Sequence, residues 1–175
     1  MATLAEVARQ EPEIAAIASR LWPGPLALES GRAVPRGEPA FAIAYLATVR
    51  RDVAPRLHPF CPILADGRLF AAIARRSPKR WDLRRDARCV IHATPGPDDD
   101  ELCIRAVASD VTSDATTTSV VRAVVARSHV GGMIESFEHE PIFEFDIQRV
   151  DIAHWVDVGQ PGTHAVREHW PRQAP

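Results

Sequence analysis

The sequence predicts a mainly β protein, an antiparallel meander that closes as a small barrel and carries a few short helices. Between residues 41 and 148, segments with strand patterns predominate, and short turns join them. Few helical patterns interrupt these segments, whereas a doubly wound parallel sheet needs a helix between successive strands. A chain of 175 residues suits one such domain, which we expect to span residues 1–175.

The composition excludes several classes of protein. The chain is 46% hydrophobic and 25% charged with a net charge of −2, which argues against a disordered chain and against a dedicated nucleic-acid binder. Its longest apolar run, Ala40–Val49, is about half of what a membrane-spanning helix needs, and the first residues carry no secretory signal pattern. Three widely spaced cysteines, Cys61, Cys89 and Cys103, indicate buried thiols of a reducing compartment. We therefore expect a cytoplasmic protein without nucleic-acid or membrane partners.

The N-terminal residues 1–39 are predicted to form a helix and a loop. Apolar residues at helical spacing run from Leu4 to Leu21, and Pro12 ends one helix or begins another. The segment Trp22–Pro39 holds four prolines and three glycines, so we expect it to be a loop.

The first three strands come next in the chain. Phe41–Val49 is apolar on both faces, which predicts a strand covered on both sides. Pro55–Ala65 is expected to be extended, Asp66-Gly67 is a strong two-residue hairpin turn, and Leu69–Ala74 completes the hairpin.

The second half of the chain is predicted to add a short helix, two strands, a longer helix and a sixth strand. In chain order these are Pro78–Asp86, Cys89–Thr94, Glu101–Val111, a helix capped by Asp114 with a stripe of Thr117, Val120, Val121, Val124 and Val125, and a strand marked by Phe143, Phe145 and Ile147. Residues 159–175 are expected to form a C-terminal extension.

The start of the short helix combines three kinds of phosphate ligand. Ser77 suits the N-cap and Pro78 the first helical position, so free backbone N–H groups and the positive end of the helix dipole face outward. Lys79, the one lysine among 21 basic residues, adds an ammonium group. An ordinary capped surface helix is the alternative, and a nucleic-acid patch is a third, because seven basic and two acidic residues lie between Arg75 and Arg88.

A second segment, Pro55–Pro62, holds three prolines in eight residues, which cannot all sit inside a sheet ladder. Its free backbone groups could serve a ligand, and Arg56 and His58 share one face of the strand. The alternative is an edge strand that its prolines protect from aggregation.

These segments carry a family resemblance. The ordered motifs are Thr48-Val-Arg, Pro55-Arg-Leu-His-Pro59, Asp66-Gly67, Ser77-Pro-Lys79, Asp82-Leu83 and Arg84-Arg-Asp-Ala-Arg88. In this order and spacing they resemble the pyridoxamine 5′-phosphate oxidase-like family over about Phe41 to Asp110. The resemblance implies a six-stranded antiparallel split β-barrel that forms a homodimer, with one FMN in each of two clefts between the subunits.

The resemblance also implies a set of cofactor-binding residues. They are Arg56, Leu57, His58, Pro59, Ser77, Lys79, Trp155 and Arg167. Ser77 and Lys79 would hold the FMN phosphate, and Arg56 would reach the phosphate or the ribityl chain. The backbone of residues 57–59 would line the isoalloxazine ring, and Trp155 and Arg167 would complete the flavin site.

The sequence departs from the family pattern where the oxidase binds its substrate. Asp52-Val-Ala-Pro55 lacks the usual glycine of the first turn, and Cys61 stands where the oxidase has a lysine for the substrate phosphate. Val121 and Val125 replace a tyrosine and an arginine, and a later Ser-Gln motif is missing. Pyridoxamine phosphate is therefore not the expected substrate.

Two classes of function remain at this point. The leading hypothesis is an FMN-dependent oxidoreductase acting on a small molecule, with a deazaflavin-dependent reductase or a haem-binding relative as variants of it. The alternative is a non-catalytic flavin-binding sensor or carrier. No catalytic residue is assigned: His58 and His92 are the best-placed candidates for an acid or a base, but each is expected to be a packed or hydrogen-bonded histidine. No metal site is predicted, because neither an HExxH motif nor paired cysteines occur.

Overall fold

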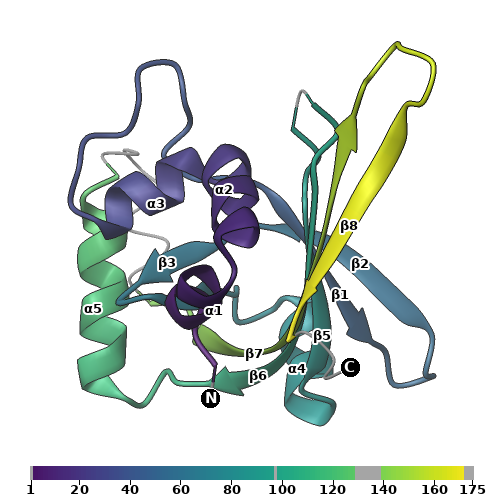
Figure 1. Ribbon diagram of the computed structural model, residues 1–175. Helices are drawn as coiled ribbons and strands as arrows, with labels where there is room; N and C mark the ends of the chain where they lie inside the picture. The colour runs from purple at the N-terminus through teal and green to yellow at the C-terminus, as the bar shows by residue number, and fades with distance from the viewer. Residues whose placement is uncertain (1, 97, 129–138, 172–175) are drawn as a thin grey trace.

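The computed structural model describes residues 2–96, 98–128 and 139–171, which form one curled antiparallel sheet with helices packed on it (Figure 1). The strands are β1 (Ala44–Val49), β2 (Pro55–Phe60), β3 (Ile63–Ala65), β4 (Arg68–Ala72), β5 (Arg88–Ala93), β6 (Glu101–Asp110), β7 (Ile142–Val156) and β8 (His164–Trp170). Their order in the sheet is β2-β1-β5-β6-β7-β4-β3, with β8 paired to β7. The predicted antiparallel split barrel is confirmed.

The described sheet has eight strands where the sequence predicts six. The segment Pro55–Ala65 divides into two strands, because Cys61-Pro62 interrupts it and sends β2 and β3 to opposite ends of the sheet order. The other additional strand, β8, lies within the predicted C-terminal extension. It pairs with the last seven residues of β7.

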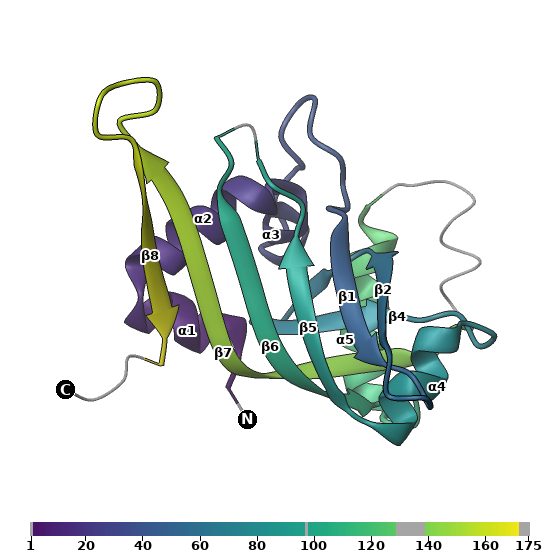
Figure 2. The same ribbon diagram turned by 90° about the vertical axis from the view of Figure 1, so that its right-hand side faces the viewer.

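The long strand β7 gives the sheet its curl (Figure 2). Its beginning, Ile142–Phe145, pairs with β4, while its end, Val150–Val156, pairs with β8. The register against β6 shifts at Arg105/Ala106, where Gln148 is the extra residue of a β-bulge. Bulges bend a strand and increase its twist, so β7 can serve both parts of the barrel.

Three helices cover the inside of the curl: α1 (Leu4–Gln10), α2 (Pro12–Leu21) and α3 (Pro23–Glu29). Thr3 and Glu6 form a capping box at the start of α1, and Pro12 and Pro23 occupy first-turn positions of α2 and α3. The prediction of an uninterrupted loop over Trp22–Pro39 is therefore wrong in its first part. A proline in the first turn costs a helix no hydrogen bond, so the proline content did not prevent α3.

The core lies between these helices and the sheet, and a smaller cluster lies beneath α5 (Ala115–Ala126). Asp114 accepts hydrogen bonds from the backbone N–H groups of Thr116 and Thr117, as expected of the N-cap. The stripe predicted for α5 is buried except for Val120. None of the helices in the described ranges is long and apolar enough to cross a membrane.

The short helix α4 (Pro78–Arg85) lies at the end of the barrel beside β1 and β2 (Figure 2). It agrees with the predicted Pro78–Asp86 except at its final residue. Leu83 reaches into the main core, which anchors the helix to the sheet.

Candidate functional site

The carboxylate of Asp82 connects α4 to the β1–β2 hairpin. One oxygen, Oδ2, accepts hydrogen bonds from Arg56 Nε at 2.7 Å and from Thr48 Oγ1 at 3.0 Å. The other, Oδ1, accepts from Arg85 at 3.3 Å. Burial raises the pKa of Asp82, but the three hydrogen bonds outweigh it and hold the pKa below its usual value. Asp82 was given no role from the sequence. A signal was present, because a spacing of three residues places Lys79, Asp82 and Arg85 on one face of the helix.

Lys79 lies against the end of β2. Its Nζ donates a hydrogen bond to the carbonyl oxygen of Pro59 at 3.0 Å. Burial lowers the pKa of the Lys79 ammonium, and the nearby Cys61 thiol acts weakly in the other direction. The pKa of Cys61 is itself raised by burial, so the thiol stays neutral near pH 7 and brings no compensating charge.

Ser77 is the N-cap of α4, as predicted, but its side chain makes no capping hydrogen bond. Pro78 follows at the first helical position, where its missing N–H costs nothing. The hydroxyl of Ser77 therefore stands at the start of the helix without the capping bond that usually engages it. The structure thus places Lys79 in contact with the end of β2, with Ser77 two residues earlier at the N-cap of the same helix.

The strand β2 runs along β1 over its whole length, with Val49 opposite Pro55 and Ala44 opposite Phe60. Among the described strands it pairs with β1 alone, so its other edge is open, as expected of a strand rich in proline. Arg56 and His58 share the inner face, as predicted, and Leu57 on the outer face is 63% exposed. Both interpretations of the segment, an edge strand and a ligand-binding strand, fit this placement.

The two histidines considered as acid or base lie on opposite faces of the sheet. His58 pairs with buried Leu46 on the inner face, whereas His92 pairs with exposed Tyr45 on the outer face. The Nδ1 atom of His92 is 2.6 Å from the carbonyl oxygen of Ala93 and is engaged by it. The two histidines cannot both face one flavin ring, and no acid–base residue emerges from the geometry.

Trp155 and Arg167 lie far from the other predicted site residues within the chain. Trp155 is on β7 and Arg167 on β8, where its guanidinium approaches Glu101 at 3.3 Å. The strands β5 and β6 separate β7 from β1, with α4 beyond (Figure 2). One chain therefore assembles residues 56–59, Ser77 and Lys79, but not Trp155 and Arg167.

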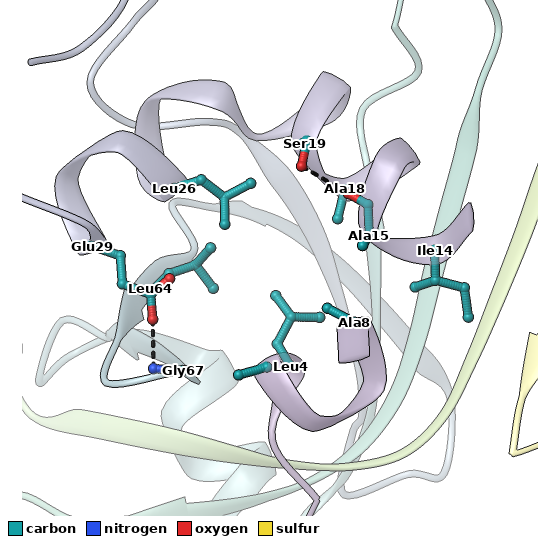
Figure 3. A pocket seen from close by; sticks show the side chains of 11 residues that line it. Leu4, Ala8, Ile14, Ala15, Ala18, Ser19, Leu26, Glu29, Leu64 and Gly67 are labelled. Carbon is teal, nitrogen blue, oxygen red and sulfur yellow. Dashed lines mark hydrogen bonds between the residues drawn. The ribbon is translucent and has the colours of Figure 1, made fainter. Parts of the chain in front are cut away.

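A largely apolar pocket lies beneath the N-terminal helices (Figure 3). Its lining includes two polar side chains, both already engaged: Ser19 donates to the Ala15 carbonyl at 2.8 Å, and Glu29 accepts from the Gly67 N–H at 2.5 Å. Gly67 has a positive φ of 69°, and a Cβ there would come within 2.7 Å of the Ala5 side chain. This pocket offers no group suited to chemistry.

Neither a metal centre nor a reactive thiol is found in the described ranges. No group of three or more His, Cys, Asp or Glu side chains there could hold a metal ion. Burial raises the pKa of Cys103, and it raises that of Cys89 to about 12. A thiol that stays protonated near pH 7 is a poor nucleophile, so the cysteines do not suggest covalent catalysis.

Comparison with known proteins gives the fold. Neither a family model nor a curated protein matches this chain. The haem storage protein HutZ from Vibrio cholerae superposes with a TM-score of 0.55 at 18% identity, over 74% of this chain and 91% of that chain. A protein from Listeria innocua described as a pyridoxamine 5′-phosphate oxidase gives 0.52 at 18% identity, over 73% and 93%. Protein Rv2991 from Mycobacterium tuberculosis gives 0.53 at 19% identity, over 62% and 74%.

Identities this low establish a shared fold and nothing about activity. The three superpositions each cover between 62% and 74% of this chain. The chain therefore has the split β-barrel fold of the pyridoxamine 5′-phosphate oxidase-like proteins.

Proposed function

We propose that the protein is an FMN-binding oxidoreductase that holds the cofactor phosphate at the start of α4. One observation carries this proposal. Lys79, whose partly buried ammonium donates to the Pro59 carbonyl oxygen, lies in the first turn of α4, and the hydroxyl of Ser77 at the N-cap makes no capping bond. An ammonium and a hydroxyl are donors that a phosphate needs, whereas Pro78 has no N–H and the Arg80 N–H already donates to the Ser77 carbonyl oxygen.

The state of Lys79 supports a bound anion. Burial disfavours its charged form, and Pro59 supplies a carbonyl oxygen but no negative charge. A bound phosphate dianion would stabilise the charged form of Lys79 and so raise the pKa of its ammonium again. Arg56 keeps its Nη atoms for the phosphate or the ribityl chain, since its Nε is bonded to Asp82.

The backbone of Leu57, His58 and Pro59 would line the isoalloxazine ring at the open edge of β2. We propose that the cleft is completed by a second copy of the chain in a homodimer. Within one chain Trp155 and Arg167 lie across the sheet from β2, and a partner subunit would bring its own copies to the cofactor. Exposed Tyr45 and Leu57 on the outer face of β1 and β2 would be covered in such a dimer.

Bound FMN would supply hydride or single-electron transfer, and the chain would supply position and electrostatics. The small-molecule substrate is not pyridoxamine phosphate in this proposal. The neutral thiol of Cys61 stands where a lysine would be needed to bind the substrate phosphate. The three unpaired cysteines suit a cytoplasmic location.

Haem binding on the same fold is the second candidate, and the likeness to HutZ favours it. A deazaflavin in place of FMN is a variant of the first. Side-by-side titration with FMN, a deazaflavin and haemin separates the three. FMN is expected to bind most tightly. Its fluorescence should be quenched when it binds the protein, and the melting temperature of the protein should rise. A colourless purified protein that does none of this with FMN would exclude the flavin proposal.

Turnover and assembly need their own measurements. A stopped-flow record should show reduction of the bound flavin by NAD(P)H and its reoxidation, whereas a sensor or carrier would bind FMN without either. Because the cleft lies between subunits in this proposal, FMN should stabilise the dimer. A monomer in gel filtration that still binds FMN would contradict the shared cleft.

A further inference from the structure

An open pocket at the β1–β2 turn is lined mainly by arginine side chains and shares only Arg56 with the proposed flavin site. Its lining residues are Arg50, Arg51, Asp52, Arg56 and Asp82, and its volume is about 400 Å³. It lies toward the C-terminal end of α4, where Arg85 donates to the carbonyl oxygen of Val49. Ser77 and Lys79 lie at the other end of the helix, next to Pro59.

The charges of this pocket are unbalanced. Asp82 is neutralised by its own contacts to Arg56 and Arg85. Asp52 is paired with Arg50 at 3.2 Å, but both side chains are about half exposed, and such surface pairs contribute little. Arg51 has no hydrogen-bond or ion-pair partner among the residues that the structure describes. The pocket therefore holds a surplus of guanidinium groups.

The turn that presents these arginines is closed and strained. Arg50 N–H donates to Ala54 O at 2.9 Å, and Val53 N–H donates to Arg50 O at 3.0 Å. Val53 has a φ of 64°, in the left-handed region that a β-branched residue rarely adopts. Backbone strain of this kind is concentrated at ligand-binding and active sites. The strain is a second observation at the same place as the unpaired charge.

We propose that this pocket binds an oxyanion group, a phosphate or a carboxylate, of a small molecule. Arg51 is the main ligand, and Arg50 is a second guanidinium group in the lining of the pocket. Guanidinium groups bind both kinds of oxyanion through two parallel hydrogen bonds, so the chemistry is shared. Asp52 competes with the anion for Arg50. Arg56 lines this pocket but is assigned to the proposed flavin site, so the anion site rests on Arg51 and Arg50 and does not depend on bound flavin.

The test is a titration of the ¹⁵N-labelled protein with sodium phosphate and, separately, sodium acetate, followed by NMR at constant ionic strength with sodium chloride as reference. The backbone amides of residues 50–53 and the Arg51 side chain should shift with saturation. Tighter binding of phosphate assigns the site to a phosphorylated molecule, and tighter binding of acetate assigns it to a carboxylate.

Four variants sharpen the test. Arg51→Ala should weaken binding by about 3- to 10-fold, the scale of one partly exposed charged hydrogen bond. Asp52→Asn, which keeps the oxygen that accepts from Ala54 N–H, should tighten binding. The matched charge changes Arg122→Ala on α5 and Asp157→Asn after β7 should leave binding unchanged.

Three results would overturn the proposal. The first is shifts at residues 50–53 no larger than those with chloride. The second is an equal loss of affinity in Arg51→Ala and Arg122→Ala. The third is a loss in Lys79→Ala that Arg51→Ala does not share, which would assign the anion to the start of α4. Arg51 and Asp52 are exposed turn residues, so both variants should fold.

Discussion

Replacing Asp82 by alanine should loosen α4 from the β1–β2 hairpin. The side chain is almost fully buried and accepts hydrogen bonds from Arg56, Thr48 and Arg85. Its removal leaves the buried hydroxyl of Thr48 and the Nε atom of Arg56 without an acceptor. Removing one partner of a buried charged network costs more than the network contributes, because the remaining groups lose both the bond and hydration.

The magnitude follows from these contacts. Hydrogen bonds to a charged group contribute about 1.5–3 kcal/mol each, but the Arg56 and Arg85 side chains are 26% and 38% exposed and can recover water. Removing one partner of a buried charged pair costs about 3–5 kcal/mol, and the partial exposure of the partners favours the lower end, so the expected loss of unfolding free energy is about 3 kcal/mol. With a urea m-value of about 2 kcal/mol/M, the midpoint should fall by about 1.5 M.

Urea unfolding followed by tryptophan fluorescence measures this loss, with Asp157→Asn as an exposed control that should leave the midpoint unchanged. The pH dependence is a second measure. The folded-state pKa of Asp82 is lowered, so its contribution is complete above the ordinary value of 3.8 and is lost as the pH falls through the folded value. Asp82→Ala should remove that part of the acid sensitivity. A loss below about 1 kcal/mol, the size of a surface pair, would refute this role.

Three further predictions concern other residues. Arg88 lowers the pKa of Asp86 to about 2, so stability supplied by Asp86 is present above pH 3.8 and lost as the pH falls toward 2; in Asp86→Asn the melting temperature should vary less with pH over this window, and an unchanged profile would contradict it. Val53→Gly should raise the unfolding free energy by about 0.5–1 kcal/mol, because relief of left-handed strain exceeds the entropy cost of glycine; a lower urea midpoint would show that Val53 is unstrained. Cys89, with a pKa of about 12, should react with a thiol reagent at pH 8 only on unfolding, and rapid labelling of Cys89 by mass spectrometry would contradict its burial.

Much of the sheet could be predicted from the sequence. The alternation at Phe143, Phe145 and Ile147 and the Asp66-Gly67 turn, with φ of 52° and 69°, are local signals that the structure confirms. The strand β8 carries no such signal. It lies beside the end of β7 with few fully buried side chains, so no alternation marks it. The helix α3 was not predicted because prolines are typical of a loop, whereas those of α3 occupy the first turn of the helix.

The site was predictable only in part. Motif order identified residues 56–59, Ser77 and Lys79, which one chain brings together, and their binding roles remain predictions. Asp82 was missed as a link because its role depends on Arg56, which lies 26 residues earlier. The sequence of one chain cannot show that Trp155 and Arg167 belong to the same site as these residues. Their proposed role depends on a second copy of the chain.

The affinity for FMN in Lys79→Ala tests the proposed flavin site most directly. Flavin fluorescence titrations of the wild-type protein, Lys79→Ala and the remote control Arg122→Ala give the three dissociation constants. Loss of a charged hydrogen bond to the phosphate should weaken binding about 5- to 150-fold in Lys79→Ala and leave Arg122→Ala unchanged. Wild-type affinity in Lys79→Ala would contradict a phosphate site at the start of α4.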